Sequence, residues 1–232
     1  MLELIKAIVL GVVEGITEFL PVSSTGHLII VAALLDFGQS LRDTFIIFIQ
    51  LGAVVAVVLF YWRDLWYQLT HFYRDRAVLR LWGAICIAFL PAAVIGVLFG
   101  SAIKARLFSP ITVASALIAV GILFIIIEKR AANQPAPATT QTMEQITSRQ
   151  ALIVGLSQLF AFIPGTSRSG ASIIGGMLAG MNRKTATQFS FYLSIPTLGG
   201  ATIYDLWENR AGLTNGDLGL LLVGAVVSGI VA

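Results

Sequence analysis

From residue 14 to residue 27 the chain reads Glu-Gly-Ile-Thr-Glu-Phe-Leu-Pro-Val-Ser-Ser-Thr-Gly-His, an apolar segment that carries two acids and breaks at a proline. The hydroxyl residues after Pro21 stand immediately before a second apolar stretch, where serine and threonine commonly cap a helix. Glu14 and Glu18 are four residues apart, which on a helix places both carboxylates on one face. The stretch therefore predicts a helix, a polar loop and a second helix.

The composition around this stretch indicates a membrane protein. Hydrophobic residues make up 57% of the 232 residues and charged residues 12%, whereas soluble domains hold about 45–50% and about 25%. A hydrocarbon core of about 30 Å needs roughly 20 apolar residues to be crossed as helix. Several long runs are apolar on every face, unlike the alternating strands of a membrane barrel. We expect an all-α, polytopic membrane protein.

The apolar runs and their breaks predict the order of the elements. The expected helices cover residues 2–20, 27–35, 45–62, 81–100, 111–127, 149–163, 171–180 and 189–204. Residues 131–148 are rich in Pro, Ala, Thr and Gln and read as an exposed linker. The last run, residues 218–232, has no polar or basic stop. Either this helix finishes at the terminus or the sequence is truncated.

The two halves of the chain resemble each other. Phe-Leu-Pro-x-Ser-Ser at residues 19–24 is echoed by Phe-Ile-Pro-x-Thr-Ser at residues 162–167, which pairs Ser24 with Ser167. We expect one membrane domain made of repeat 1 (about 1–130), the linker (about 131–148) and repeat 2 (about 149–232). Each repeat holds a short, interrupted helix pair, which favours a re-entrant hairpin. If each hairpin enters and leaves the membrane on one side, three full crossings separate the two hairpins. Because this number is odd, the second repeat has the inverted orientation.

Basic residues give the orientation. The positive-inside rule makes one set of loops cytoplasmic, with Arg63, Arg74, Arg76, Arg80, Lys129, Arg130, Arg149, Arg183 and Lys184. The opposite loops hold Arg42, Lys104, Arg106 and Arg210. On this count the first hairpin opens to the outside and the second to the cytoplasm. We see no basic stripe for a nucleic acid.

The two acids in the first helix suggest chemistry. An acidic residue in a membrane helix costs about 2.5–3.5 kcal/mol at the helix centre, so such residues usually face a cavity. Paired carboxylates suit a hard divalent cation or general acid and base catalysis. The residue pattern leaves both roles for Glu14 and Glu18 open, beside the plainer role of solvating the hairpin at the membrane interface.

The two polar loops predict an anion site. In the first loop, Ser23, Ser24 and Thr25 precede a helix start, whose free N–H groups favour phosphate, and His27 adds a titratable ring. In the second loop, Pro-Gly-Thr-Ser-Arg-Ser-Gly at residues 164–170 repeats this pattern around Arg168. Small residues let backbone amides approach an anion, and a guanidinium group can donate two parallel hydrogen bonds to one phosphate. If the hairpins meet, they form a pyrophosphate site at membrane depth, and an apolar surround favours a lipid substrate.

The run from Glu14 to His27 and the run from Pro164 to Gly170 resemble the bacitracin-resistance family of undecaprenyl-pyrophosphate phosphatases. The resemblance extends to Gln-Leu-Gly at residues 50–52 and Phe-Ser-Phe at residues 189–191. It implies inverted repeats around a pocket open to the periplasm, in the plasma (inner) membrane of a bacterium. The implied reaction hydrolyses undecaprenyl pyrophosphate to undecaprenyl phosphate and inorganic phosphate. This would recycle the lipid carrier of cell-wall synthesis and confer bacitracin resistance.

The resemblance also implies roles for single residues. Glu14 and Glu18 would bind a divalent cation, Mg²⁺ or Ca²⁺, or act as acid and base. Ser24 would be the candidate nucleophile or would position water, with His27 or Glu18 as its base, and Arg168 would clamp the pyrophosphate. Thr25, His27, Ser167 and Ser169 would complete the phosphate shell. The other residues expected to bind pyrophosphate are Ser23, Gly26, Thr166 and Gly170.

Two other functions compete with this reading. A flippase or anion transporter without hydrolysis shares inverted repeats and broken helices. A lipid phosphatase with a histidine nucleophile would need a second histidine, but His71 lies in a basic loop far from either phosphate motif. The expected partners are the polyprenyl pyrophosphate lipid and the bilayer, and a homodimer stays open.

Overall fold

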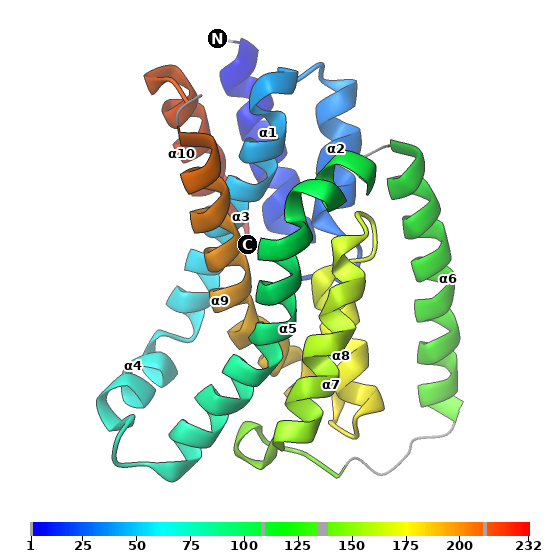
Figure 1. The fold of residues 1–232 in the computed structure, drawn as a ribbon, viewed down its shortest axis with the longest axis vertical. Coiled ribbons are helices and arrows are strands. Elements are labelled where there is room, and N and C mark those ends of the chain that lie inside the picture. The colour runs from blue at the N-terminus through cyan, green and yellow to red at the C-terminus, as the bar shows by residue number, and fades with distance from the viewer. Residues whose placement is uncertain (1, 108–109, 134–138, 211–212) are drawn as a thin grey trace.

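The computed structural model describes residues 2–107, 110–133, 139–210 and 213–232, and these residues are almost entirely helical (Figure 1). Within those ranges there is no strand, only an isolated bridge between Thr140 and Met181. This confirms the all-α class. The helices are α1 (Leu2–Thr17), α2 (Ser24–Leu34), α3 (Gln39–Phe60), α4 (Trp62–His71), α5 (Arg76–Leu107), α6 (Pro110–Asn133), α7 (Ser148–Gln158), α8 (Arg168–Leu178), α9 (Arg183–Asn209) and α10 (Asn215–Val231).

Two short hairpins enter the molecule from opposite ends. The pair α1 and α2 begins and ends at the top of Figure 1, whereas α7 and α8 begin and end at the bottom. Their loops meet in the middle: a side chain added at Gly26 would lie 3.4 Å from the Cα of Gly165, and one at Gly170 would lie 3.3 Å from the Cβ of Pro21. Residues far apart in the sequence therefore share one central region.

Both hairpins use the same local structure to start their second helix. Ser23 and Ser167 are the N-caps of α2 and α8, with φ of 61° and 67°. Each hydroxyl oxygen accepts a hydrogen bond from the amide three residues later, at 3.3 Å and 3.1 Å. Such capping satisfies an N–H group that the helix itself leaves free. Positive φ is uncommon outside glycine, so finding it at both positions marks them as structurally equivalent.

This equivalence corrects the pairing expected from the sequence. The N-cap serines pair with each other, so Ser24 corresponds to Arg168 rather than to Ser167. The reason is an extra residue between the proline and the N-cap of the second loop. There the chain turns at Gly165 with φ of 104°, a conformation that glycine adopts without steric cost.

The long helices present apolar surface to their surroundings. Residues 41–60 of α3 and 76–100 of α5 are long and apolar enough to cross a membrane. Only 22% of the most apolar window of the α5 span is buried, and large hydrophobic side chains such as Val94, Leu98 and Ile122 are exposed on α5 and α6. An exterior of this kind is stable in a lipid environment rather than in water.

Each half of the chain completes the packing of the other. Helix α10 packs against α1 and α3, and α5 packs against α7 and α9. Glycines allow close approach at both places: a side chain at Gly11 would lie 2.7 Å from the carbonyl oxygen of Gly224, and one at Gly155 would lie 2.6 Å from that of Ala88. Two buried hydrophobic clusters result. Close approach at small residues is the usual packing of membrane helices.

Two expectations about the connections are wrong. The region after residue 62 was expected to be a loop, but residues 62–71 form α4; the segment is short and half polar, so no long apolar run marks it. The linker was expected to be exposed, but Met143 and Ile146 are buried, and Thr140 donates its backbone N–H to the carbonyl of Gly180 at 3.2 Å. The first residues of the expected linker belong to α6, and residues 134–138 lie outside the described residues.

Candidate active site

A cavity of about 360 Å³ lies where the two hairpin loops meet α5 and α9. Its polar lining comes from both halves of the chain and comprises Glu18, Ser23, Ser24, Thr25, Gln50, Gln158, Ser167 and Arg168. Its apolar wall comes mainly from α5 and α9 and includes Phe89, Ala93, Gly96, Val97, Leu198 and Ala201. Farther along α9 the lining includes Tyr204, Asp205 and Glu208. The cavity therefore joins a polar region to an apolar wall.

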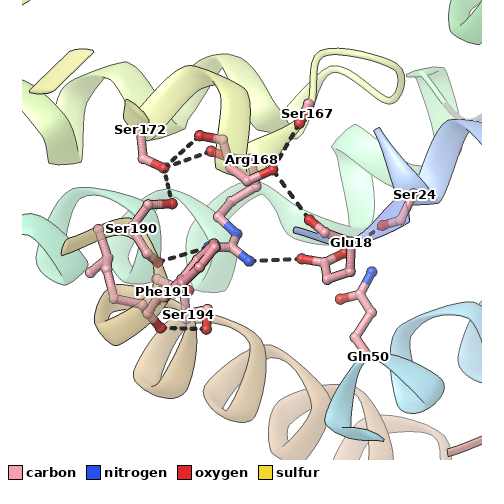
Figure 2. Close-up of polar contacts among 12 residues, drawn as sticks. Glu18, Ser24, Gln50, Ser167, Arg168, Ser172, Ser190, Phe191 and Ser194 are labelled. Atoms are coloured by element: carbon pink, nitrogen blue, oxygen red, sulfur yellow. Dashed lines mark hydrogen bonds and ion pairs between the residues drawn. The ribbon is translucent and has the colours of Figure 1, made fainter. Parts of the chain in front are cut away.

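Glu18 links the two hairpins. Its Oε1 accepts a hydrogen bond from Nη2 of Arg168 at 2.7 Å, and its Oε2 accepts one from Oγ of Ser24 (Figure 2). The Glu18 side chain is 5% exposed and that of Arg168 12%. Removing one member of a buried ion pair leaves an uncompensated charge and is strongly destabilising. Ser24 and Arg168 are therefore linked through Glu18. This agrees with the expectation that the two hairpin loops meet.

Arg168 is held from behind by α9. Its Nη1 donates to the backbone carbonyl of Ser190 at 3.0 Å, and the Ser190 hydroxyl lies 2.7 Å from that of Ser172. Ser172 also donates to the carbonyl of Arg168 at 2.9 Å. These contacts hold the guanidinium group and the backbone carbonyl of Arg168 (Figure 2). Sequence reasoning did not assign Ser172 or Ser190, although Ser190 lies in the Phe-Ser-Phe run.

The serines of the second loop join the loops together. The Ser169 hydroxyl donates to the carbonyls of Glu18 at 3.2 Å and Leu20 at 3.1 Å, and lies 3.1 Å from the Ser167 hydroxyl. Ser167 lines the cavity, whereas Ser169 is 1% exposed and does not. Thr166 and Gly170 are also buried outside the cavity lining. The structure thus places these predicted phosphate ligands behind the cavity surface.

In the first loop, too, some residues line the cavity and others lie behind it. Thr25 lines the cavity, and its Oγ1 accepts a hydrogen bond from Nε2 of Gln50 at 3.3 Å. Gly26 is buried against the second loop. His27 does not line the cavity; its Nδ1 lies 2.9 Å from the carbonyl oxygen of Ser23. Among the two bases considered for Ser24, the structure thus places Glu18 in contact with it.

Glu14 lies one turn before Glu18, behind the cavity. Its side chain is 0% exposed, and its carboxylate oxygens make no hydrogen bond of good geometry in the described part of the chain, although the side chains of Glu18 and Ser24 lie close to them. It is close enough to Glu18 and Arg168 for electrostatic interaction. A buried carboxylate without good hydrogen bonds is costly unless a proton or a cation compensates it. In the described residues, no cluster of three His, Cys, Asp or Glu side chains accompanies the pair.

Gln158 is the last residue of α7, in the second hairpin, and it is buried. Its Nε2 donates to the carbonyl of Ala88 at 3.1 Å, while its buried Oε1 has no partner in the described residues. The amide lines the cavity. Neither Gln50 nor Gln158 was assigned from the sequence, because a lone glutamine in an apolar helix carries no spacing signal.

The arrangement suits the binding and transfer of a phosphate group. Helices α2 and α8 both begin at the cavity, so their N-terminal ends favour an anion there. Arg168 adds a charged donor, and Ser24 stands against a carboxylate that can accept its proton. Fold and site together define a helical membrane protein in which an arginine, a carboxylate and a serine hydroxyl meet at one buried cavity.

The family model of the bacitracin resistance protein BacA matches residues 7–232. The chain belongs to this family. A protein of Albidiferax ferrireducens named undecaprenyl-diphosphatase is 51% identical over 97% of this chain and 81% of its own length. Similar relatives are undecaprenyl-diphosphatase 2 of Rhodospirillum rubrum, 52% identical over 98% of this chain and 82% of its own, and a Polaromonas undecaprenyl-diphosphatase, 50% identical over 97% and 81%.

Proposed function

We propose that this chain hydrolyses undecaprenyl pyrophosphate to undecaprenyl phosphate and inorganic phosphate, which recycles the lipid carrier and confers bacitracin resistance. The observation that carries the proposal is the contact of Glu18 with both Ser24 and Arg168 at a cavity with an apolar wall. The family and the names of its relatives support the same reaction. The polar lining receives the pyrophosphate, and the apolar wall receives the start of the prenyl chain.

The reaction begins with the phosphate replacing Glu18 as the partner of Arg168. An incoming pyrophosphate carries more negative charge than one carboxylate, and guanidinium binds phosphate oxygens by two points. Glu18 is then free to take the proton from Ser24, with which it is already in contact. Arg168 and the N-termini of α2 and α8 stabilise the charge on the non-bridging oxygens in the transition state.

In the path through Ser24, the serine oxygen is the nucleophile. The Ser24 oxygen forms a bond to the terminal phosphorus, the bond from this phosphorus to the bridging oxygen breaks, and undecaprenyl phosphate leaves with the bonding electrons. Water then attacks the phosphoserine, the bond from phosphorus to the Ser24 oxygen breaks, and Glu18 returns its proton to that oxygen. The proton given up by the water leaves with the phosphate or to solvent. In the other path, Ser24 and Glu18 orient a water that attacks the same phosphorus directly.

A divalent cation, Mg²⁺ or Ca²⁺, fits the acidic pair. Both oxygens of Glu14 are buried next to Glu18 and make no hydrogen bond of good geometry in the described residues, and magnesium is commonly bound by one or two carboxylates together with substrate phosphates. Glu14 and Glu18 would hold the cation, which would neutralise charge on the phosphate oxygens. Terbium luminescence tests this: binding should be lost in Glu14→Gln and kept in Glu144→Gln, which changes an exposed acid at the far end.

The hairpins are re-entrant in this proposal, and the repeats are inverted across the plasma membrane. Their opposite entry and central meeting support this (Figure 1). The segment from α4 to the start of α5, which contains Arg63, Arg74 and Arg76, lies at the end where α7 begins and α8 ends (Figure 1). Under the positive-inside rule that end faces the cytoplasm. The end at which α1 begins then faces the periplasm or exterior, and the cavity opens there.

Phosphate release from a purified lipid pyrophosphate tests the function. The chain in detergent with Mg²⁺ should release one phosphate per substrate, and Glu18→Gln should abolish release while Glu144→Gln keeps it. Correct folding of both variants is checked by thermal unfolding. Lipid translocation by the intact protein without phosphate release would contradict hydrolysis and favour a flippase.

A further inference from the structure

Helix α4 stands apart from the catalytic machinery. Only Tyr61 separates it from the end of α3, and it lies obliquely at the lower end of the bundle (Figure 1). None of its residues is buried. Its inward side is fixed by Gln68, whose Nε2 donates to the hydroxyl of Tyr192 at 3.3 Å and whose Oε1 accepts from Nε1 of Trp82 at 3.0 Å. The orientation of α4 on the bundle is therefore defined.

Another side of α4 carries an exposed apolar stripe. Trp62, Trp66 and Leu69 follow one another at helical spacing and are 53%, 53% and 69% exposed. The two indole rings stack with centroids 5.6 Å apart. Tryptophan is enriched where a membrane meets water, because its ring is apolar and its N–H is polar. The stripe is therefore suited to the boundary between headgroups and acyl chains.

Positive charge lies next to this stripe. Arg63, Arg74 and Arg76, named here the basic cluster, are all exposed. The acids nearby in the sequence are Asp64 and Asp75. Asp75 already accepts hydrogen bonds from the hydroxyl of Tyr67 at 3.3 Å and the backbone N–H of Ala77 at 2.8 Å. The three arginines outnumber the two aspartates, so residues 62–76 carry a net charge of +1 (three positive less two negative, with His71 neutral).

We propose that α4 is an interfacial helix that binds anionic phospholipid headgroups through the basic cluster while Trp62, Trp66 and Leu69 insert beneath them. The occupant is the bilayer because α3 is long enough to cross it and α4 begins where α3 ends. The stripe and the arginines match the two faces of an interfacial helix. Anionic lipids attract basic residues near the membrane surface. The site is separate from the cavity and does not depend on the proposed hydrolysis.

Tryptophan quenching tests the insertion. The full chain is reconstituted in phosphatidylcholine vesicles whose acyl chains carry bromine near the headgroup. Bromine quenches nearby indoles, so Trp62→Phe/Trp66→Phe should lose a large share of the quenched signal. Equal lipid quenching in this variant and the parent overturns the proposal. So does quenching of both indoles by aqueous iodide alone, which is the result expected if the stripe were open to a soluble protein partner.

A lipid-competition measurement tests the charge. In mixed vesicles, the parent should be quenched more by brominated phosphatidylglycerol than by brominated phosphatidylcholine. R63Q/R74Q/R76Q should lower this preference by about fivefold or more. The control is R42Q/R106Q, which removes arginines at the start of α3 and the end of α5, at the end of the bundle opposite α4 (Figure 1), and should keep the preference. Arg210 is left unchanged because its guanidinium lies over the ring of Trp207. If R63Q/R74Q/R76Q keeps the preference of the parent for phosphatidylglycerol, the assignment to anionic lipid is wrong.

Discussion

Arg168 donates a hydrogen bond from Nη2 to Oε1 of Glu18 at 2.7 Å, although 150 residues separate them in the sequence. The contact joins the start of α8 to the loop after α1. Because Oε2 of the same carboxylate contacts Ser24, the position of the nucleophile candidate depends on the second half of the chain. The pair is therefore the point at which both halves of the protein become one site.

Replacing Arg168 by lysine should keep the charge but lose the geometry. A lysine ammonium cannot contact Glu18, the Ser190 carbonyl and a phosphate with the fixed fork of guanidinium. We expect kcat to fall roughly 100- to 1,000-fold, the usual effect of removing one donor to a developing oxyanion. Phosphate release measures it. Arg149→Lys, at an exposed position of α7, is the control and should retain parental turnover.

Replacing Ser24 by alanine separates the two proposed paths. If the serine oxygen attacks phosphorus, its loss should lower kcat by at least about 1,000-fold. Ser115→Ala, an exposed serine of α6, should have no effect. We expect the larger loss, because Ser24 already contacts a proton acceptor. A loss of only about tenfold would instead indicate direct attack by water.

His27 should act by positioning the first loop. Its Nδ1 lies against the carbonyl of Ser23, the N-cap with positive φ that precedes Ser24. We expect His27→Ala to lower kcat by less than the roughly 100-fold that loss of a general base costs. The pH profile of kcat should keep its shape. Disappearance of the acidic limb in this variant would show that His27, and not Glu18, takes the proton.

Ser190 should matter for stability more than for turnover. Arg168 contacts the Ser190 backbone, whereas the Ser190 hydroxyl meets only Ser172 in the contacts described above. Ser190→Ala keeps the carbonyl and removes one buried hydrogen bond, while Ser172 keeps its bond to the carbonyl of Arg168, so unfolding should become easier by about 0.5–1.5 kcal/mol. We expect kcat close to the parental value. Thermal unfolding in detergent and phosphate release measure the two effects, and a large fall in kcat would place the hydroxyl in the site itself.

The contact between α5 and α7 should be intolerant of a methyl group. At Gly155 an added Cβ would lie 2.6 Å from the carbonyl oxygen of Ala88. Overpacking of this kind costs about 1–3 kcal/mol. Gly121→Ala is the matched control, since no atom lies within 4 Å of its added Cβ, and alanine should be neutral or stabilising there. Equal melting temperatures for both variants would contradict the observed helix packing.

The elements and many site residues could be predicted from the sequence because their signals are local. Apolar runs too long for a soluble domain indicate membrane helices, proline breaks them, and serine caps the next helix. Glu18, Ser24 and Arg168 stand out because polar groups are costly in such surroundings. Helix α4 was missed for the opposite reason: a short, half-polar segment at the membrane surface lacks an apolar run.

The tertiary structure alone decided which of these residues meet. Local patterns could not choose between Glu18 and His27 as the partner of Ser24, nor align Ser24 with Arg168, because one extra residue in the second loop shifts the pairing. Gln50 and Gln158 line the cavity because the helices that carry them pack beside it. The physical reason is that helix formation depends on neighbours within a turn or two. The contacts of Glu18 depend instead on how two hairpins pack against each other.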